Sequence, residues 1–329
     1  MQRQPSLFTN KPKMTFLLKI NYFLFTILLF IFSCSKEENA SFTTFQTPTQ
    51  DELCGIYFWN QMEGIAVGGN TWTRAIRLST NDGGLSWKKD SLFDKQIFCL
   101  GSNQLGLLIG LGIEFNCYQF TTQQTTISKL GNFRFFRALD VYNPELIIAA
   151  GGESFGTGYL EKINTKSLTS RQILTINKEL DAIQCIDSLN WVAAGYGIIL
   201  RSKDSGEHWD TLDYSGDHFR DLSFVDSTGY IIGITGTILK SDDAGYTWNK
   251  IRKSQSIFVK NFPLRTVCFK NKWEGIIGGE DGLVWRTTNG GTSWITLNGL
   301  PDCNYLDSFW DGSHFWLCGS NGVIIRLDD

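Results

Sequence analysis

The chain has 329 residues, of which 14% are aromatic, 33 are Gly and only six are Pro. This composition favours strands and tight turns, and the length suits one large all-β domain as well as two average domains. The formal net charge is −3, and removal of the four basic residues among the first 33 leaves 26 basic against 33 acidic residues, a net charge of −7. This charge argues against a nucleic-acid-binding or anionic-membrane-binding surface.

Residues 1–33 are predicted to be a signal peptide. A basic start is followed by an apolar run, 20–32, that is too short to span a bilayer, and no acidic residue precedes Glu37. Met1 and Met14 both remain candidate start residues. The basic residues are Arg3, Lys11, Lys13 and Lys19.

The run ends in IFSC (31–34), which resembles a bacterial lipobox and predicts lipidation of Cys34. The alternative is an ordinary signal peptide with an incidental Cys. SKEE (35–38) resembles a surface-export signal of Gram-negative lipoproteins. We therefore expect residues 34–40 to form a lipidated tether, and the protein to be anchored in the cell envelope at the outer membrane, with surface display as the further expectation.

Seven cysteines remain after Cys34, and none of them forms a CxxC or a zinc-binding spacing. Four lie in apolar runs and are expected to be small buried side chains; whether any disulfide forms is left open. They are Cys99, Cys185, Cys268 and Cys318.

One eight-residue phrase occurs four times and always ends in Trp. Its last three Trp residues are 39 and 46 positions apart, and the first gap of 122 equals three such units. Such spacing is typical of a repeat fold, and it implies two units that have lost the phrase. The four copies are TNDGGLSW (80–87), SKDSGEHW (202–209), SDDAGYTW (241–248) and TTNGGTSW (287–294).

Each unit is predicted to contain four strands. In the unit RTVCF…GIIGG…LVWR…WITL (265–297), the second strand is apolar throughout, which indicates that both of its faces are covered. Six such units precede a seventh that begins at Tyr305 and stops after three strands. The alternating segment SFTTFQT (41–47) would supply its fourth strand and close the ring. The sequence thus predicts an all-β, seven-bladed β-propeller over residues 41–329, with an N-terminal strand completing the last blade.

The phrase resembles the Asp-box, or BNR, repeat of sialidases, sortilin-type receptors and photosystem II stability/assembly factors, where it forms the hairpin between the third and fourth strands. We expect a structural clasp in which the acid accepts turn amides, Gly takes a positive φ and Trp packs on the blade. A ligand or calcium role is the alternative. The residues are Asp82, Gly84, Trp87, Asp204, Gly206, Trp209, Asp243, Gly245, Trp248, Asn289, Gly291 and Trp294.

Segments 233–248 and 279–294 show the longer pattern GxxGx[IV]x[RK]SxDxGxxW most fully, which is similar to the photosystem II stability/assembly factor family. The resemblance implies a non-enzymatic assembly factor that holds protein subunits. Nothing in the sequence indicates photosynthesis, so a different client is expected.

The sequence offers little catalytic chemistry. His208, His218 and His314 share no metal spacing, and no catalytic or cofactor motif occurs, so we expect no metal and no cofactor. Sialidases usually carry an Arg-Ile-Pro segment in the first blade, which is missing here. The Asp-box resemblance therefore concerns the fold and not an activity.

Three predicted first strands begin with Arg: Arg137, Arg220 and Arg265. Asp181 and Tyr305 occupy the corresponding positions of two other units. Because first strands line the axis of a propeller, these side chains would ring one mouth of its channel and suit carboxylates of a partner. The alternative is that each Arg pairs with a neighbouring acid such as Asp181 or Asp221.

The leading hypothesis is a lipid-anchored β-propeller without a catalytic role that binds a protein or glycan partner. The alternative is a glycan-acting enzyme related to sialidases, which would require several carboxylates to converge on the channel mouth. A third interpretation is a structural repeat protein whose interface is formed by the two units without the phrase.

Overall fold

The computed structural model describes residues 1, 37–92, 95–103, 106–131, 134–252 and 262–328. In this part of the chain, regular structure consists of strands and two 3-10 turns, Ile113–Phe115 and Ser320–Gly322. These residues contain no helix long and apolar enough to cross a membrane. Cys34 and the predicted signal peptide lie outside the described residues. Residues 37–329 form one compact unit.

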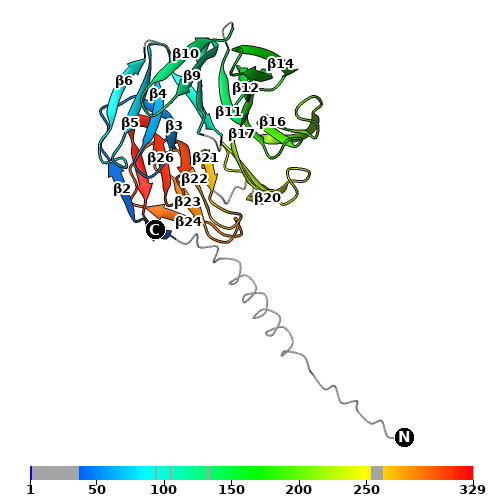
Figure 1. Ribbon diagram of the computed structural model, residues 1–329. Helices are drawn as coiled ribbons and strands as arrows, with labels where there is room; N and C mark the ends of the chain where they lie inside the picture. Colours follow the sequence, from blue (N-terminus) through cyan, green and yellow to red (C-terminus); the bar gives the residue numbers. More distant parts are fainter. Residues whose placement is uncertain (2–36, 93–94, 104–105, 132–133, 253–261, 329) are drawn as a thin grey trace. The chain divides into compact units, whose positions relative to one another are not determined.

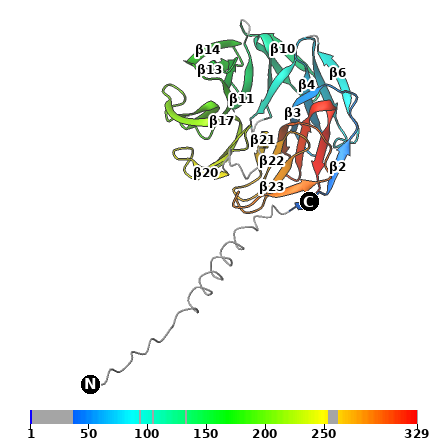
Figure 2. The same ribbon diagram turned by 180° about the vertical axis from the view of Figure 1, so that it is seen from behind.

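The described strands form six sheets, arranged around a common axis (Figure 1 and, from behind, Figure 2). Three of them are four-stranded antiparallel meanders that follow one another along the chain. Their strands are β3 (Glu52–Phe58), β4 (Gly64–Asn70), β5 (Arg74–Thr80) and β6 (Lys88–Leu92); β7 (Ile97–Ser102), β8 (Leu108–Gly112), β9 (Asn116–Phe120) and β10 (Thr125–Lys129); and β11 (Phe136–Asn143), β12 (Leu146–Glu153), β13 (Thr157–Asn164) and β14 (Thr169–Ile176).

The fourth sheet has six strands, which corrects the prediction of seven separate blades. Two expected units share this sheet because β17 is continuous: it serves as the fourth strand of one unit and the first strand of the next. The end of β16 pairs with the start of β17, and the end of β17 pairs with β18. The all-β propeller is confirmed, but with six sheets. The strands are β15 (Leu180–Cys185), β16 (Trp191–Ser202), β17 (Asp210–Val225), β18 (Thr228–Gly233), β19 (Ile238–Ser241) and β20 (Asn249–Arg252).

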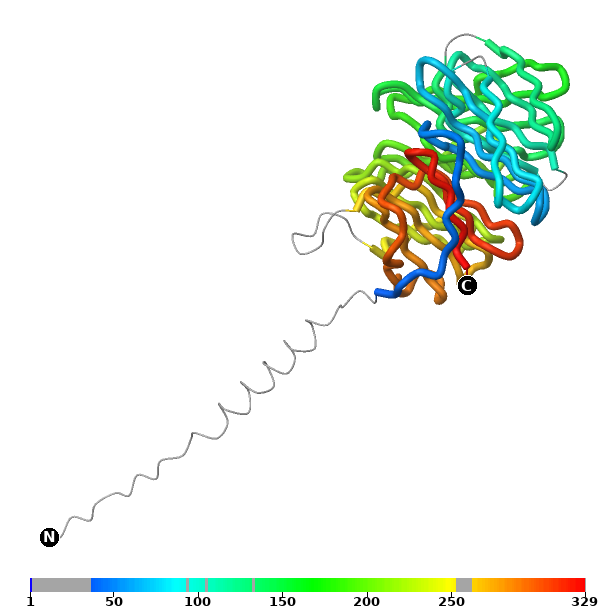
Figure 3. The backbone as a smooth tube through the Cα atoms, turned by 90° about the vertical axis from the view of Figure 1, so that its left-hand side faces the viewer, coloured from blue at the N-terminus to red at the C-terminus, as the bar shows by residue number. Residues whose placement is uncertain are grey.

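The last two sheets contain both ends of the unit. Strand β2 pairs antiparallel with β27, so the N-terminal strand completes the last sheet as predicted. Figure 3 shows the blue N-terminal segment beside the red C-terminal one. The remaining strands are β21 (Leu264–Phe269), β22 (Gly275–Gly279), β23 (Val284–Thr287) and β24 (Ile295–Asn298), joined by β1 (Glu37–Asn39); and β25 (Tyr305–Trp310), β26 (Phe315–Gly319) and β27 (Ile324–Leu327), joined by β2 (Phe42–Phe45).

Strand β1 was not expected. It pairs in parallel with β24, and Ala40 N–H donates to the Asn298 carbonyl oxygen at 3.1 Å. The predicted tether 34–40 is therefore corrected at its end, since residues 37–39 belong to the propeller unit. A three-residue exposed strand carries too little apolar patterning to be recognised in a sequence.

The second strands form the core of the fold. Strands β8, β22 and β26 are buried at every residue, because neighbouring sheets cover both faces. Aromatic rings fill the gaps between sheets: Phe58 stacks on Trp316 with ring centroids 4.2 Å apart, and Tyr230 stacks on Phe269 at 3.8 Å. The predicted burial of these strands is confirmed, and each pairs with a first strand that lies at the axis.

Glycines near the ends of second strands allow a close backbone approach. A Cβ on Gly68 would lie 2.0 Å from the Glu52 carbonyl oxygen, and one on Gly195 would lie 2.0 Å from that of Glu179. In both cases the carbonyl belongs to the residue just before or at the start of the first strand of the same unit. The small residue thus makes room for a bulge in the first strand.

Candidate functional site: the channel mouth

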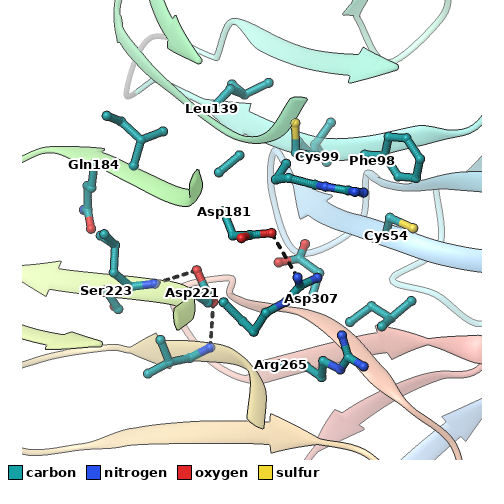
Figure 4. A pocket seen from close by; sticks show the side chains of 18 of the residues that line it. Cys54, Phe98, Cys99, Leu139, Asp181, Gln184, Asp221, Ser223, Arg265 and Asp307 are labelled. Carbon is teal, nitrogen blue, oxygen red and sulfur yellow. Dashed lines mark hydrogen bonds and ion pairs between the residues drawn. The ribbon is translucent and has the colours of Figure 1, made fainter. Parts of the chain in front are cut away.

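A cavity of about 310 Å³ lies on the axis of the propeller (Figure 4). The first strand of every repeat unit contributes to its wall, and β17 contributes with its second half. The strands are β3, β7, β11, β15, β17, β21 and β25.

Each of these strands carries a one-residue β-bulge, close to its start or, in β17, where its second half begins, and the bulged residue lines the cavity. In β11, for example, Phe136 pairs with Gly151 and Ala138 with Ala150, so Arg137 is left without a partner across the ladder. A bulge redirects its side chain and bends the strand. We call the bulged residues the mouth residues: Cys54, Phe98, Arg137, Asp181, Arg220, Arg265 and Leu306.

The three predicted arginines are therefore brought to one cavity. Burial lowers the pKa of Arg220, Asp181 opposes that shift, and the positive charges of Arg265 and Arg137 lower it further. The positive charges of the three guanidinium groups therefore repel one another within the cavity. Arg137 also lies over the rings of Phe98 and Phe135, with its Cζ 5.3 and 5.5 Å from their centroids.

Each arginine has an acidic partner, as the alternative interpretation predicted. Arg137 Nε donates to Glu179 Oε1 at 3.3 Å. Arg220 Nη1 donates to Asp181 Oδ1 at 2.9 Å. Asp221, the other acid considered as a partner of these arginines, instead accepts the Val267 main-chain amide.

Arg265 is held by Glu280, to whose Oε1 atom its Nε donates at 2.9 Å. Side chains fixed in this way lose less conformational freedom when they bind a further anion. The sequence missed Glu179 and Glu280 as partners because both lie outside the first strands.

The prediction that Tyr305 lies at the mouth is wrong. Its side chain is fully buried, and its hydroxyl donates to the Pro301 carbonyl oxygen at 3.1 Å. It cannot contact a partner at the mouth. Its register partner is Gly319, and the bulged residue of β25 is Leu306. The position predicted to correspond to the arginines was therefore one residue too early in this strand. A shift of one residue turns a side chain to the other face of the strand.

Below the mouth, acidic side chains join neighbouring first strands. Asp221 Oδ2 accepts the Val267 amide at 2.7 Å, and Asp307 Oδ2 accepts the Ile56 amide at 2.8 Å. Burial raises the pKa of Asp221 and of Asp307 to about 7, with the charge of Asp221 adding to the shift at Asp307. Sequence reasoning did not identify this pair, although each follows a mouth residue directly.

The Asp-box residues lie at the other end of the first strands. In the third copy, Asp243 Oδ1 accepts the Thr247 amide at 2.9 Å and the Ser241 hydroxyl at 2.8 Å, and Ser241 Oγ accepts the Gly245 amide at 2.9 Å. Gly245 has φ +81°, and Trp248 is buried against its sheet. These contacts hold the turn between the third and fourth strands.

The other copies repeat these bonds. Each Asp or Asn Oδ1 accepts the amide four residues later at 2.9 Å, and each Gly has φ between +78° and +87°. Trp87 is buried, whereas Trp209 and Trp294 are partly buried against the core. The residues are Asp82, Gly84 and Trp87; Asp204, Gly206 and Trp209; and Asn289, Gly291 and Trp294.

In the described ranges, the cysteines form no disulfide, and the three histidines lie in separate places. No group of three or more His, Cys, Asp or Glu residues there could hold a metal ion. The seven cysteines from Cys54 to Cys318 are free thiols. His208 binds its own Asp-box acid, and His314 lies near Asp311, whereas His218 is buried and bonds to the mouth residue Asp181.

Residues 215–306 match the family model of the photosynthesis system II assembly factor YCF48. The predicted family resemblance is confirmed. A structure of YCF48 bound to D1 peptide is similar, with 14% sequence identity, a TM-score of 0.70, and coverage of 89% of this chain and 97% of that one.

Two further structures are similar in fold. YCF48 from Cyanidioschyzon merolae shows 13% identity and a TM-score of 0.65, covering 88% of this chain and 98% of that one. The WD40 propeller domain of Doa1 shows 12% identity and a TM-score of 0.65, covering 88% and 97%. No curated protein sequence matches the chain.

Proposed function

We propose that this protein is a non-enzymatic scaffold that binds an acidic segment of a protein partner at the channel mouth. The observation that carries this proposal is the convergence of Arg137, Arg220 and Arg265 on one cavity. A guanidinium group has five N–H donors, and the acid that holds each arginine accepts only one or two of them. Pairing therefore orients the arginines and leaves donors for a carboxylate.

The similar structure of YCF48 bound to D1 peptide supports a protein partner, since a related propeller binds a peptide. A glycan partner has no separate support in the geometry of the mouth.

The second candidate is a glycan-acting enzyme, favoured by the carboxylates that line the cavity. Asp140, Asp181, Asp221 and Asp307 all do so. However, Asp140, Asp221 and Asp307 each accept a main-chain amide of the next first strand, which is a structural role. Turnover of aryl sialosides or other aryl glycosides by the purified chain would establish this candidate, and its absence would leave the scaffold.

The anchor is part of the proposal. Lipidation at Cys34, followed by the short segment before β1, would tether the propeller to the cell envelope, at the outer membrane and on the cell surface. Metabolic labelling with a palmitate analogue tests this: wild type should incorporate the label, and Cys34→Ser should not. Protease treatment of intact cells reports surface display.

Cross-linking on intact cells followed by affinity capture tests the scaffold. The variant Arg137→Glu/Arg220→Glu/Arg265→Glu should lose the partner that wild type captures. The control Lys166→Glu/Arg171→Glu/Lys203→Glu makes the same change in charge at exposed cations away from the mouth. Equal capture by both variants would exclude the mouth as the binding site.

A further inference from the structure

Two exposed aromatic side chains lie beside the mouth arginines. Phe155, in the turn between β12 and β13, is 56% exposed, and Tyr196, within β16, is 48% exposed. Their ring centroids are 5.5 Å apart, and each lies 5.6 Å from the ring of His218, which is buried. We call Phe155, Tyr196 and His218 the aromatic platform.

Phe155 adopts an unfavourable backbone conformation. Ser154 and Phe155 have φ of +55° and +61°, and the Gly156 amide donates to the Glu153 carbonyl oxygen at 3.2 Å, which defines a type I′ turn. Such turns favour Gly or Asn, and a bulky side chain destabilises them. Phe155 is nevertheless half-exposed, and strained residues of this kind cluster at functional sites.

Two buried acids join the platform to the arginines. Glu179 accepts Arg137 Nε with one oxygen and the Phe155 amide, at 3.0 Å, with the other. The Glu179 carbonyl oxygen also accepts the Tyr196 amide at 2.9 Å. Glu179 thus positions one mouth arginine and both exposed rings.

Asp181 makes the second connection. Its Oδ1 accepts Arg220 Nη1 at 2.9 Å, and its Oδ2 hydrogen-bonds to Nε2 of His218, the buried ring of the platform. Glu179 and Asp181 are almost fully buried, so both connections are shielded from solvent. The cationic mouth and the apolar platform are therefore held as one surface.

We infer that this surface recognises a peptide that combines a carboxylate with an aromatic or large aliphatic side chain. The carboxylate binds the mouth arginines, and the apolar side chain packs on Phe155 and Tyr196. The inference rests on the proposed function and adds a determinant of specificity. Exposed aromatic rings supply contact area at low entropic cost, and arginine supplies charge complementarity.

Selection of phage-displayed 12-residue peptides on the full chain tests this inference. Enriched peptides should carry an acidic residue close to an aromatic or large aliphatic residue. Their affinities are then measured by fluorescence anisotropy for wild type and variants. The variant Arg137→Gln/Arg220→Gln/Arg265→Gln should bind none of them.

Phe155→Gly and Tyr196→Ser should each weaken binding about tenfold, the loss expected for one well-packed aromatic contact. Glycine adopts the left-handed conformation readily, so Phe155→Gly preserves the turn, which a thermal melt verifies. Trp273→Ser is the matched control, because this exposed ring lies in the connection between β21 and β22, at the Asp-box end. It should bind as wild type does.

The other outcomes separate the two proposals. Acidic peptides without an apolar residue, bound equally by wild type and Phe155→Gly, would overturn the platform and leave the scaffold function standing. If no enriched peptide depends on the arginines, the scaffold function fails, and the inference fails with it.

Discussion

Arg220 and His218 share one carboxylate: Arg220 Nη1 donates to Oδ1 of Asp181 at 2.9 Å, and His218 Nε2 bonds to its Oδ2. Both residues lie on β17, whereas Asp181 is the mouth residue of β15. This pairing joins the first strands of the two units within the six-stranded sheet. It also fixes the guanidinium group in the mouth.

Replacing that shared acid should affect stability and binding together. Asp181→Ala leaves Arg220 and His218 without their buried partner, and we expect the free energy of unfolding to fall by about 1–3 kcal/mol. Asp181→Asn keeps one acceptor and should lose less. Urea unfolding checks this ranking, and equal stability of all three proteins would contradict it.

The raised pKa of Asp307 leads to a predicted dependence of the unfolding free energy on pH. Its pKa is raised from 3.8 to about 7 by burial, so the folded protein holds the proton to higher pH than the unfolded chain does. The stabilisation of the folded state by the protonated Asp307 carboxyl is therefore complete below about pH 4 and is lost as the pH rises to about 7. Asp307→Asn stays neutral and should flatten the stability profile over this window.

Denaturant unfolding at pH 4, 5, 6 and 7 measures the difference in slope. Asp221→Asn should act in the same direction, because the pKa of Asp221 is raised to about 7 as well. Glu145→Gln, at an exposed site far from the cavity, is the control. A wild-type slope in both variants would show that these carboxyls titrate normally.

Replacing an Asp-box acid by alanine should destabilise the fold more than replacing it by asparagine. Asp243 accepts the Thr247 amide and two hydroxyl groups, and Asn289 makes the equivalent amide contact in the fourth copy. We expect Asp243→Ala to lower the unfolding free energy by about 1–2 kcal/mol and Asp243→Asn by less than half of that. Thermal melts at constant pH rank the variants, and a fully stable Asp243→Ala would refute the clasp.

Closure by β2 predicts a sharp difference between two deletions. From the propeller unit, removing residues 1–40 deletes only the exposed β1 and the adjoining Ala40, and the melting temperature should change little. Removing residues 1–47 also deletes Phe45, which is buried and stacks on Trp316 at 5.1 Å, and exposes the edge of β27. We expect a loss of at least about 3 kcal/mol, as for deletion of a buried aromatic.

Gly195→Ala tests the connection between the bulge and the site. A Cβ at this position would lie 2.0 Å from the Glu179 carbonyl oxygen, so the start of β15 must move. Both Glu179 and Asp181 would shift, and binding of acidic peptides should fall more than the loss of stability explains. Gly299→Ala, where the Cβ would meet no atom within 4 Å, is a control without a steric clash; its φ of +87° destabilises an alanine there, but peptide binding should not change.

The sequence by itself determined the propeller and its closure. Hydrophobic periodicity, turn glycines and the repeated Trp are local patterns, and each unit contains such patterns within about 40 residues. The alternating segment before β3 was sufficient to predict β2. These features depend on which faces of a strand are covered, and composition along the strand records that directly.

The sequence also placed three arginines correctly, because each stands at the start of a first strand. It failed at Tyr305, where one residue of register decides between the buried face and the cavity, and it could not show that two units share one sheet. It also missed the bond of His218 to Asp181, which lies 37 positions away. Only the tertiary structure decided the bulges, the acidic partners and the aromatic platform, because these depend on contacts between strands that no local pattern encodes.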